Sequence, residues 1–411
     1  MGSRFHGNDI NQGQIRAGVP VSKVRSVAFS LIPVMIVLLM LEVIGRVIYP
    51  FDADARAEIK AERDSRLQLS YLSATGHGKE ILTDIHRQAQ HYVPFLGWIG
   101  QPNMTLPTLH TNDLGFRDAP IEPRRSNERR VLVLGGSTAW GLGASANEHT
   151  VSGALEARLN RDAQGVRYRV MSGAYPAWQS RHELITLMEF YDRFDPDVVI
   201  ALTGYNDLFT LTYGSDGELH TRPESRMLAR AVDESLRPMT TLQALRKVAG
   251  SLGIWRIVIH FREQVAAAKP REAITRYEKS MSDKVTPLIR DRYLTMADFT
   301  RRHGARLIIA LQPDIFTTRK PMTAEELAVK HTITESQHDI SATYSRYRAD
   351  LLAQLNEQLP AADVAVIDLA GVLDATDEPV FIDACHLNDA GYHALAKSLQ
   401  AQLTQQVAAW Q

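Results

Sequence analysis

Four polar side chains, far apart in the chain, have the types that acyl-transfer chemistry needs. Ser137 lies in GGSTAWGLG, directly after an aliphatic run, and offers a hydroxyl nucleophile at a glycine-rich turn. Asp383 and His386 lie three residues apart in DACH, and they offer a base with a carboxylate to orient its imidazole. Asn206 in TGYND follows a second aliphatic run, and its amide could donate to a developing oxyanion.

Each of these motifs also has a plainer interpretation. A serine after a strand often caps a helix, and Asn-Asp pairs are common in turns. A lone histidine usually serves packing or surface polarity, and we assign His393 that role. Cys385, the single cysteine among 411 residues, has no evident basic partner and is expected to be a small packing residue. The order of the motifs, with three of them after strand-like runs, favours one shared active site.

The segments that must position these residues alternate between two kinds of pattern. Short apolar runs predict strands, and helical patterns lie between them, which is typical of a parallel sheet wrapped by helices. Ligands bind such sheets at the carboxyl ends of the strands. The helix that follows DACH is expected to be capped by Asn388 or Asp389. The predicted strands are 131–135, 168–172, 197–202, 306–312 and 363–368.

Taken in this order, the four motifs resemble those of the SGNH (GDSL-type) hydrolases over residues 90–405. The resemblance implies a flavodoxin-like, doubly wound parallel sheet of five strands in an α/β fold. It also implies a catalytic triad of Ser137, His386 and Asp383, with no metal and no organic cofactor. Gly136 replaces the Asp of the nominal GDSL motif, and related members carry GGST.

The resemblance further implies an oxyanion hole with three donors. Two of them would be the backbone N–H of Ser137 and the side-chain amide of Asn206. The third would be a backbone N–H in SGAYPAWQS, where the family's glycine aligns with Ala174 and Gly173 lies just before it. Either residue could donate, because an alanine also carries an N–H. The other matches to the family's Gly-x-Asn-Asp pattern, expected to support the site, are Gly204 and Asp207.

An apolar stretch of 22 residues, Val27–Ile48, contains only Glu42 and Arg46 as charged residues. A helix of this length covers the ~30 Å hydrocarbon core of a bilayer, so the stretch predicts a single transmembrane anchor. A cleaved signal peptide and a buried core helix are the alternatives. The Lys and Arg counts on its two sides do not decide the orientation.

TNDLGFRD at 111–118 and KPMTAEEL at 320–327 resemble segments of membrane-anchored bacterial members of the family. This resemblance implies a catalytic domain on the periplasmic or extracytoplasmic side of the membrane. Residues 1–26 would then be a cytoplasmic polar tail.

The rest of the chain is assigned by composition and spacing. A net charge of −1 with 45% hydrophobic residues indicates a globular chain without the charge that nucleic-acid binding needs. Residues 49–129 are expected to be a linker and lead-in, whose basic run 123–130 is a solvated loop. The hydrolase domain is expected at 130–405. Residues 208–270 exceed what one crossover needs and predict a helical insertion, either a lid or a packing subdomain.

The same catalytic residues serve several reactions. Transfer of the acyl group to water makes an esterase acting on an O-acyl ester, expected to be an O-acetyl ester of a saccharide. Transfer to a sugar hydroxyl makes a polysaccharide O-acyltransferase, working beside an acyl-donor membrane protein. A lipid esterase and a catalytically silent carbohydrate-binding scaffold are further alternatives. The expected partners are therefore an acylated small-molecule, saccharide or lipid substrate and the membrane, with no nucleic acid.

Overall fold

The computed structural model describes residues 21–48, 78–207, 252–253, 257–258, 285–337, 341–359 and 364–408. The chain divides into two compact units, Met1–Glu58 with Glu234–Pro270 and Ile59–Asp233 with Arg271–Gln411. Most of the predicted polar tail and of the predicted insertion at 208–270 lies outside the described residues.

The described part of the first unit is mainly helix α1 (Val21–Ile48). Its apolar side chains from Leu31 to Val47 are exposed, and Arg46 Nε lies 2.6 Å from Glu42 Oε1 one helical turn away. Within the described part of the chain, no helix combines the length and apolar character needed to cross a membrane.

The second unit is built on a parallel sheet of five strands in the order β4-β3-β5-β6-β7. Of these five strands, β3 comes first along the chain, and it lies between β4 and β5, the next two. This is the doubly wound flavodoxin-like order. All five predicted strands are therefore confirmed, with ends shifted by up to three residues. Their bounds are β3 Glu128–Gly135, β4 Arg167–Ala174, β5 Val198–Thr203, β6 Arg306–Leu311 and β7 Val364–Asp368.

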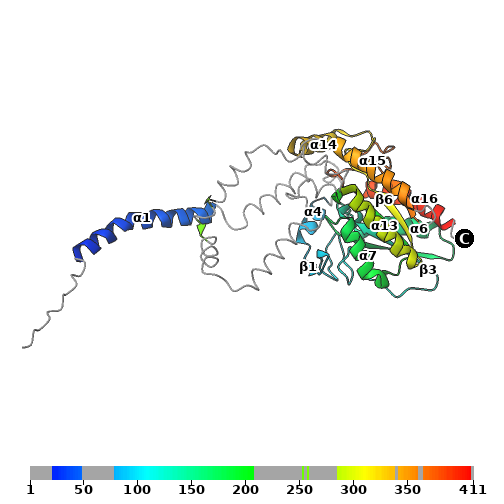
Figure 1. Ribbon diagram of the computed structural model, residues 1–411, viewed down its shortest axis with the longest axis horizontal. Helices are drawn as coiled ribbons and strands as arrows, with labels where there is room; N and C mark the ends of the chain where they lie inside the picture. The colour runs from blue at the N-terminus through cyan, green and yellow to red at the C-terminus, as the bar shows by residue number, and fades with distance from the viewer. Residues whose placement is uncertain are drawn as a thin grey trace, which may run out of the picture. The chain divides into compact units, whose positions relative to one another are not determined.

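Helices cover the sheet in two groups (Figure 1). Helix α6 packs on α16, while α13 packs on both α7 and α15. Right-handed crossovers place the two groups on opposite faces of the sheet, which explains why β5 is buried along its whole length. The helix bounds are α4 Gly78–Arg87, α5 Ser137–Trp140, α6 Val151–Asp162, α7 Ser180–Phe194, α13 Thr286–Arg302, α14 Ala324–Gln337, α15 Ser341–Gln358 and α16 Asp389–Ala408.

Side-chain caps determine where two of these helices begin. The Thr150 hydroxyl accepts a hydrogen bond from Gly153 N at 3.2 Å and caps α6. Asn388 Oδ1 accepts from Gly391 N at 3.1 Å, so Asn388 is the cap of α16. Asp389 has a different role, because its carboxylate accepts from the backbone N–H of Ser145 at 2.8 Å and from its hydroxyl.

The lead-in segment packs into the second unit. It contains a short antiparallel hairpin that the sequence patterns did not predict, formed by β1 (Gln90–Val93) and β2 (Gly97–Gly100). Ile81 of α4 packs against Ile382 in a small apolar cluster, next to Asp383. Residues 78–118 are thus an integral part of the fold; those that join the main core are Leu96, Ile99, Leu109 and Phe116.

Part of the basic run 123–130 is tied to neighbouring acids. Arg124 Nη2 lies 2.6 Å from Asp197 Oδ2, and the buried Arg130 Nε lies 2.7 Å from Glu128 Oε1. The expectation of a solvated loop was therefore wrong for these two arginines. Arg124 connects the approach to β3 with Asp197, just before β5, and Arg130 pairs with Glu128 within β3.

Candidate active site

The nucleophile turn requires two glycines for different reasons. Gly135 ends β3 at φ +148°, and a Cβ there would lie 2.2 Å from the carbonyl oxygen of Leu202 on β5. At Gly136 a Cβ would lie 2.2 Å from the Asn206 amide nitrogen. The chain therefore turns sharply into α5 with Ser137 as its first residue. No hydrogen bond is seen from the backbone N–H of Ser137 to the described residues.

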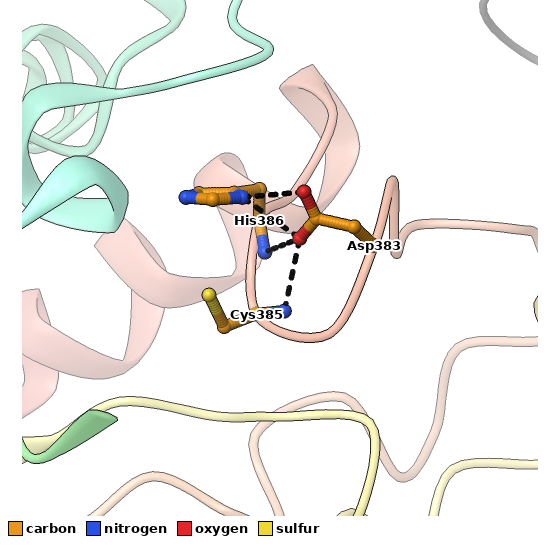
Figure 2. A group of neighbouring side chains, drawn as sticks. All are labelled: Asp383, Cys385 and His386. Atoms are coloured by element: carbon orange, nitrogen blue, oxygen red, sulfur yellow. Dashed lines mark hydrogen bonds and ion pairs between the residues drawn. The ribbon is translucent and has the colours of Figure 1, made fainter. Parts of the chain in front are cut away.

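The structure brings together Ser137, His386 and Asp383, which are separated by almost 250 residues in sequence. His386 Nε2 lies 2.5 Å from Ser137 Oγ. His386 Nδ1 lies 2.7 Å from both carboxylate oxygens of Asp383 (Figure 2). Asp383 Oδ1 also accepts hydrogen bonds from the backbone N–H of Cys385 at 3.1 Å and of His386 at 3.0 Å. These contacts fix the carboxylate, which in turn orients the imidazole toward the serine.

A buried hydroxyl joins the serine helix to the loop of His386. Thr138 Oγ1 donates to the carbonyl oxygen of Cys385 at 3.1 Å and accepts from Gln312 Nε2 at 2.9 Å. All three residues are buried. The sequence motifs contained Thr138 and Gln312, but their partnership spans 174 residues and has no local pattern that reveals it.

The Asn206 side chain lies against the nucleophile turn. Its Nδ2 donates to the carbonyl oxygen of Trp178 at 2.7 Å. An amide nitrogen has two hydrogens, so one remains for a substrate oxygen. The absence of a side chain at Gly136 gives this amide its place beside Ser137.

The structure does not support Gly173 or Ala174 as the third oxyanion donor. Both residues belong to β4, and they pair with Leu134 and Gly135 of β3. Ala174 is 0% exposed and Gly173 is buried, so neither backbone is accessible to a bound substrate. The prediction is corrected on this point.

Ala177 is better placed to be that donor. It is exposed and has φ +61°, a conformation that L-residues other than glycine seldom adopt. No acceptor for its N–H is seen among the described residues. It directly precedes Trp178, whose carbonyl oxygen binds Asn206. Sequence reasoning missed Ala177 because a positive φ is signalled by glycine, and here the residue is alanine.

The two supporting residues act on the turn that carries Asn206. Gly204 adopts φ +106°, which lets the chain leave β5 and turn. Asp207 accepts from the Ser180 backbone N–H at 3.0 Å and from the Ser180 hydroxyl at 2.7 Å. Burial raises the pKa of Asp207, and the guanidinium of Arg292 opposes that shift.

A buried cation holds the segment after the serine helix. Arg117 donates to the carbonyl oxygens of Gly141 at 2.6 Å and Ala144 at 3.0 Å, and its guanidinium lies 4.9 Å from the centre of the Trp140 ring. Desolvation lowers the pKa of Arg117 to about 10. The lead-in segment therefore supports α5 directly.

Asp383, Cys385 and His386 are also of the residue types that bind metal ions. One ligand atom from each lies within 4.8 Å of the others (Figure 2). The carboxylate and the imidazole are already engaged with each other and with backbone and serine donors, and Cys385 is buried. The arrangement therefore suits proton transfer better than a resident ion.

A doubly wound α/β sheet with a serine, a histidine and a carboxylate in contact at its strand ends defines a serine-hydrolase class of site. The model of the GDSL-like Lipase/Acylhydrolase family matches residues 133–394, well over half of the chain. The chain belongs to this family and is a carboxylic ester hydrolase.

The chain is also similar, at low identity, to several solved structures. The lipase Lip_vut3 from a goat rumen metagenome is 14% identical with a TM-score of 0.39, covering 66% of this chain and 96% of its own. The acetyl xylan esterase AlAXEase is 11% identical with a TM-score of 0.36, covering 67% and 99%. TesA is 14% identical with a TM-score of 0.36, covering 68% and 99%. No curated protein sequence matches the chain.

Proposed function

We propose that the protein hydrolyses O-acyl esters by serine acyl transfer, with Ser137, His386 and Asp383 as the triad. The observation that carries this proposal is the continuous contact from Ser137 Oγ to His386 Nε2 at 2.5 Å and from His386 Nδ1 to Asp383 at 2.7 Å. A nucleophile, a base and an orienting carboxylate in this sequence are what acyl transfer at neutral pH requires.

In the first half-reaction, Ser137 Oγ attacks the ester carbonyl carbon while its proton passes to His386 Nε2. Asp383 stabilises the imidazolium that forms. The tetrahedral intermediate then expels the alcohol, which takes the proton from His386. In the second half-reaction, water attacks the acyl-serine, His386 accepts a proton from that water, and the same proton returns to Ser137 as the acid leaves.

Three donors are proposed for the oxyanion of each tetrahedral intermediate. They are the backbone N–H of Ser137, the free amide hydrogen of Asn206 and the backbone N–H of Ala177. The proposal for Ala177 is supported by its exposure, its positive φ and its position next to the carbonyl that binds Asn206. A preorganised donor of this kind contributes about 3 kcal/mol to lowering the barrier.

The proposed substrate is an O-acyl ester of a saccharide, with acetyl as the acyl group. The support is the resemblance of 111–118 and 320–327 to segments of membrane-anchored bacterial members. A sugar hydroxyl in place of water would make the same site an acyltransferase.

Time-resolved intact mass of the full-length protein in detergent with p-nitrophenyl acetate tests the function. Steady nitrophenol release that is lost in Ser137→Ala is the expected result. An acetyl adduct on Ser137 that persists until a saccharide is added would instead identify a transferase. Full activity of Ser137→Ala would contradict the mechanism.

We also propose that Val27–Ile48 anchors the protein in a membrane, with the catalytic unit on the extracytoplasmic side. The support is the 22-residue apolar stretch in the sequence and the exposed apolar side chains from Leu31 to Val47. The side chains of residues 21–30, which include the start of this stretch, lie outside the described part of the chain. Carbonate extraction of isolated membranes tests the anchor, and protease treatment of spheroplasts tests the side. Release of the protein by carbonate, or protection of the catalytic unit from added protease, would contradict the corresponding part.

A further inference from the structure

A buried polar cluster lies behind the turn 203–207, outside the residues that contact the substrate. Helix α7 contributes Ser180 and Glu183, three residues apart on one face. Helix α13 contributes two consecutive residues, Arg292 and Tyr293. All four side chains are buried, and the proposed chemistry uses none of them.

The cluster holds the turn at both of its ends. At the strand end, Tyr293 Oη lies 2.6 Å from Thr203 Oγ1 and 3.1 Å from Glu183 Oε2. At the far end, Arg292 Nη1 donates to Ser180 Oγ at 3.0 Å and lies 3.4 Å from Asp207 Oδ1. The residue between these two anchors that faces the serine is Asn206.

We propose that Glu183 is a positioning residue, which together with Arg292 clamps the turn 203–207 and so fixes the Asn206 amide beside Ser137. This inference rests on the proposed function, because it assigns Glu183 a task only if Asn206 binds the oxyanion. Glu183 contacts no reacting atom and acts through Tyr293 and Thr203.

The clamp needs Glu183 in its uncharged form. Glu183 Oε1 is buried and has no hydrogen-bond partner among the described residues, a costly position for an anionic oxygen. The Tyr293 hydroxyl has one proton and lies next to two oxygens, Glu183 Oε2 and Thr203 Oγ1. A protonated Glu183 can therefore donate to Tyr293, which in turn donates to Thr203. Ionisation of Glu183 would reverse the direction of its hydrogen bond with Tyr293 and add a second negative charge near Asp207.

The surroundings of Glu183 favour the uncharged form. The charged and titratable groups that face it are Asp207 in the turn after β5, Arg292 and Tyr293 on α13, and Tyr347 on α15. Burial first, and then the negative charge of Asp207, raises the pKa of Glu183 to about 8. The acid is therefore neutral below that pH and becomes anionic above it, which loosens the clamp on the alkaline side.

The test is the pH dependence of kcat and KM for p-nitrophenyl acetate with the full-length protein, after subtraction of the rate with Ser137→Ala. The wild-type kcat is expected to fall by about tenfold as the pH rises through about 8 and then to level off, because the ionised form keeps the triad and loses the clamp, with KM little changed. Glu183→Gln should stay within about threefold of wild type at pH 7 and lose that fall. Glu189→Gln, an exposed residue of the same helix, should keep the wild-type profile.

Three results would overturn the proposal: no alkaline fall in wild type, an unchanged fall in Glu183→Gln, or loss of the fall in Glu189→Gln. If Glu183→Gln does not fold, Tyr293→Phe is the second variant. It should lower kcat by about tenfold without changing KM, and a wild-type kcat would reject the clamp. Activity that survives in Ser137→Ala would contradict the proposed function itself, whatever the pH profiles and kcat values of the Glu183 and Tyr293 variants.

Discussion

The hydroxyl of Thr138 offers a direct test of how the two halves of the site are held together. Replacing Thr138 with Val keeps the shape of the side chain and removes both of its hydrogen bonds. The amide of Gln312 and the carbonyl oxygen of Cys385 then each lose a buried partner. The backbone of the loop that carries Asp383 and His386 also loses its hydrogen bond to the serine helix, while the contact of His386 with Ser137 remains.

The magnitude follows from those two groups. A buried polar group left unsatisfied costs about 1–3 kcal/mol, so we expect the free energy of unfolding to fall by about 2–6 kcal/mol for the two groups. The 2.5 Å contact between His386 Nε2 and Ser137 Oγ would loosen by a fraction of an ångström. Misplacement on that scale lowers kcat by about 10- to 100-fold, or about 1.4–2.8 kcal/mol of barrier, while KM changes little.

The assay is steady-state hydrolysis of p-nitrophenyl acetate, with thermal unfolding measured on the same samples. Thr300→Val is the matched control, because Thr300 is equally buried and its hydroxyl donates only to backbone oxygens of α13. Thr138→Ser keeps the hydroxyl and should recover most of the rate. Equal kcat values for Thr138→Val and Thr300→Val would show that the hydrogen bonds of Thr138 do not position the catalytic residues.

Two further substitutions test the proposed oxyanion donors. Gly136→Ala would place a Cβ 2.2 Å from the Asn206 amide nitrogen, so we expect kcat to fall by about 100-fold or more, as for loss of one donor; an unchanged kcat would separate Asn206 from catalysis. Ala177→Gly keeps the backbone N–H and relieves a φ of +61°, so kcat should be retained and the protein stabilised by about 1 kcal/mol. A lower melting temperature for that variant would show that the positive φ is not strained.

Local patterns were sufficient to predict the sheet, whereas the residues of the proposed triad came from the resemblance to the SGNH hydrolases. Buried parallel strands are short apolar runs, and such runs mark all five strands of the sheet. Ser137, Asn206, Asp383 and His386 each lie at a strand end or in a loop of recognisable spacing. The proximity of Ser137 and Asn206 follows from the topology, because β3 and β5 are neighbours and bring their carboxyl ends together. The loop of Asp383 and His386 follows β7, which is not next to β3, so its contact with Ser137 depends on the course of that loop.

The features that were missed depend on contacts between distant segments. The pairing of Thr138 with Gln312 and the clamp of Glu183 with Tyr293 join elements more than 100 residues apart. Ala177 was missed for a different reason, since its positive φ is imposed by the surrounding turn and not by its own residue type. Asn388 rather than Asp389 caps α16, because the Asp389 carboxylate accepts a hydrogen bond from the distant Ser145.

The packing of Ile81 on Ile382 indicates that an active enzyme needs residues that precede the family match. The family match starts at residue 133, yet helix α4 covers the residue beside Asp383 from a point more than fifty residues earlier. A fragment cut at the first strand of the large sheet would expose Ile382 and would remove the hydrogen bonds from Arg117 to the carbonyls of Gly141 and Ala144. A minimal enzyme that keeps these contacts therefore includes Ile81 of α4 and Arg117, both of which precede the family match.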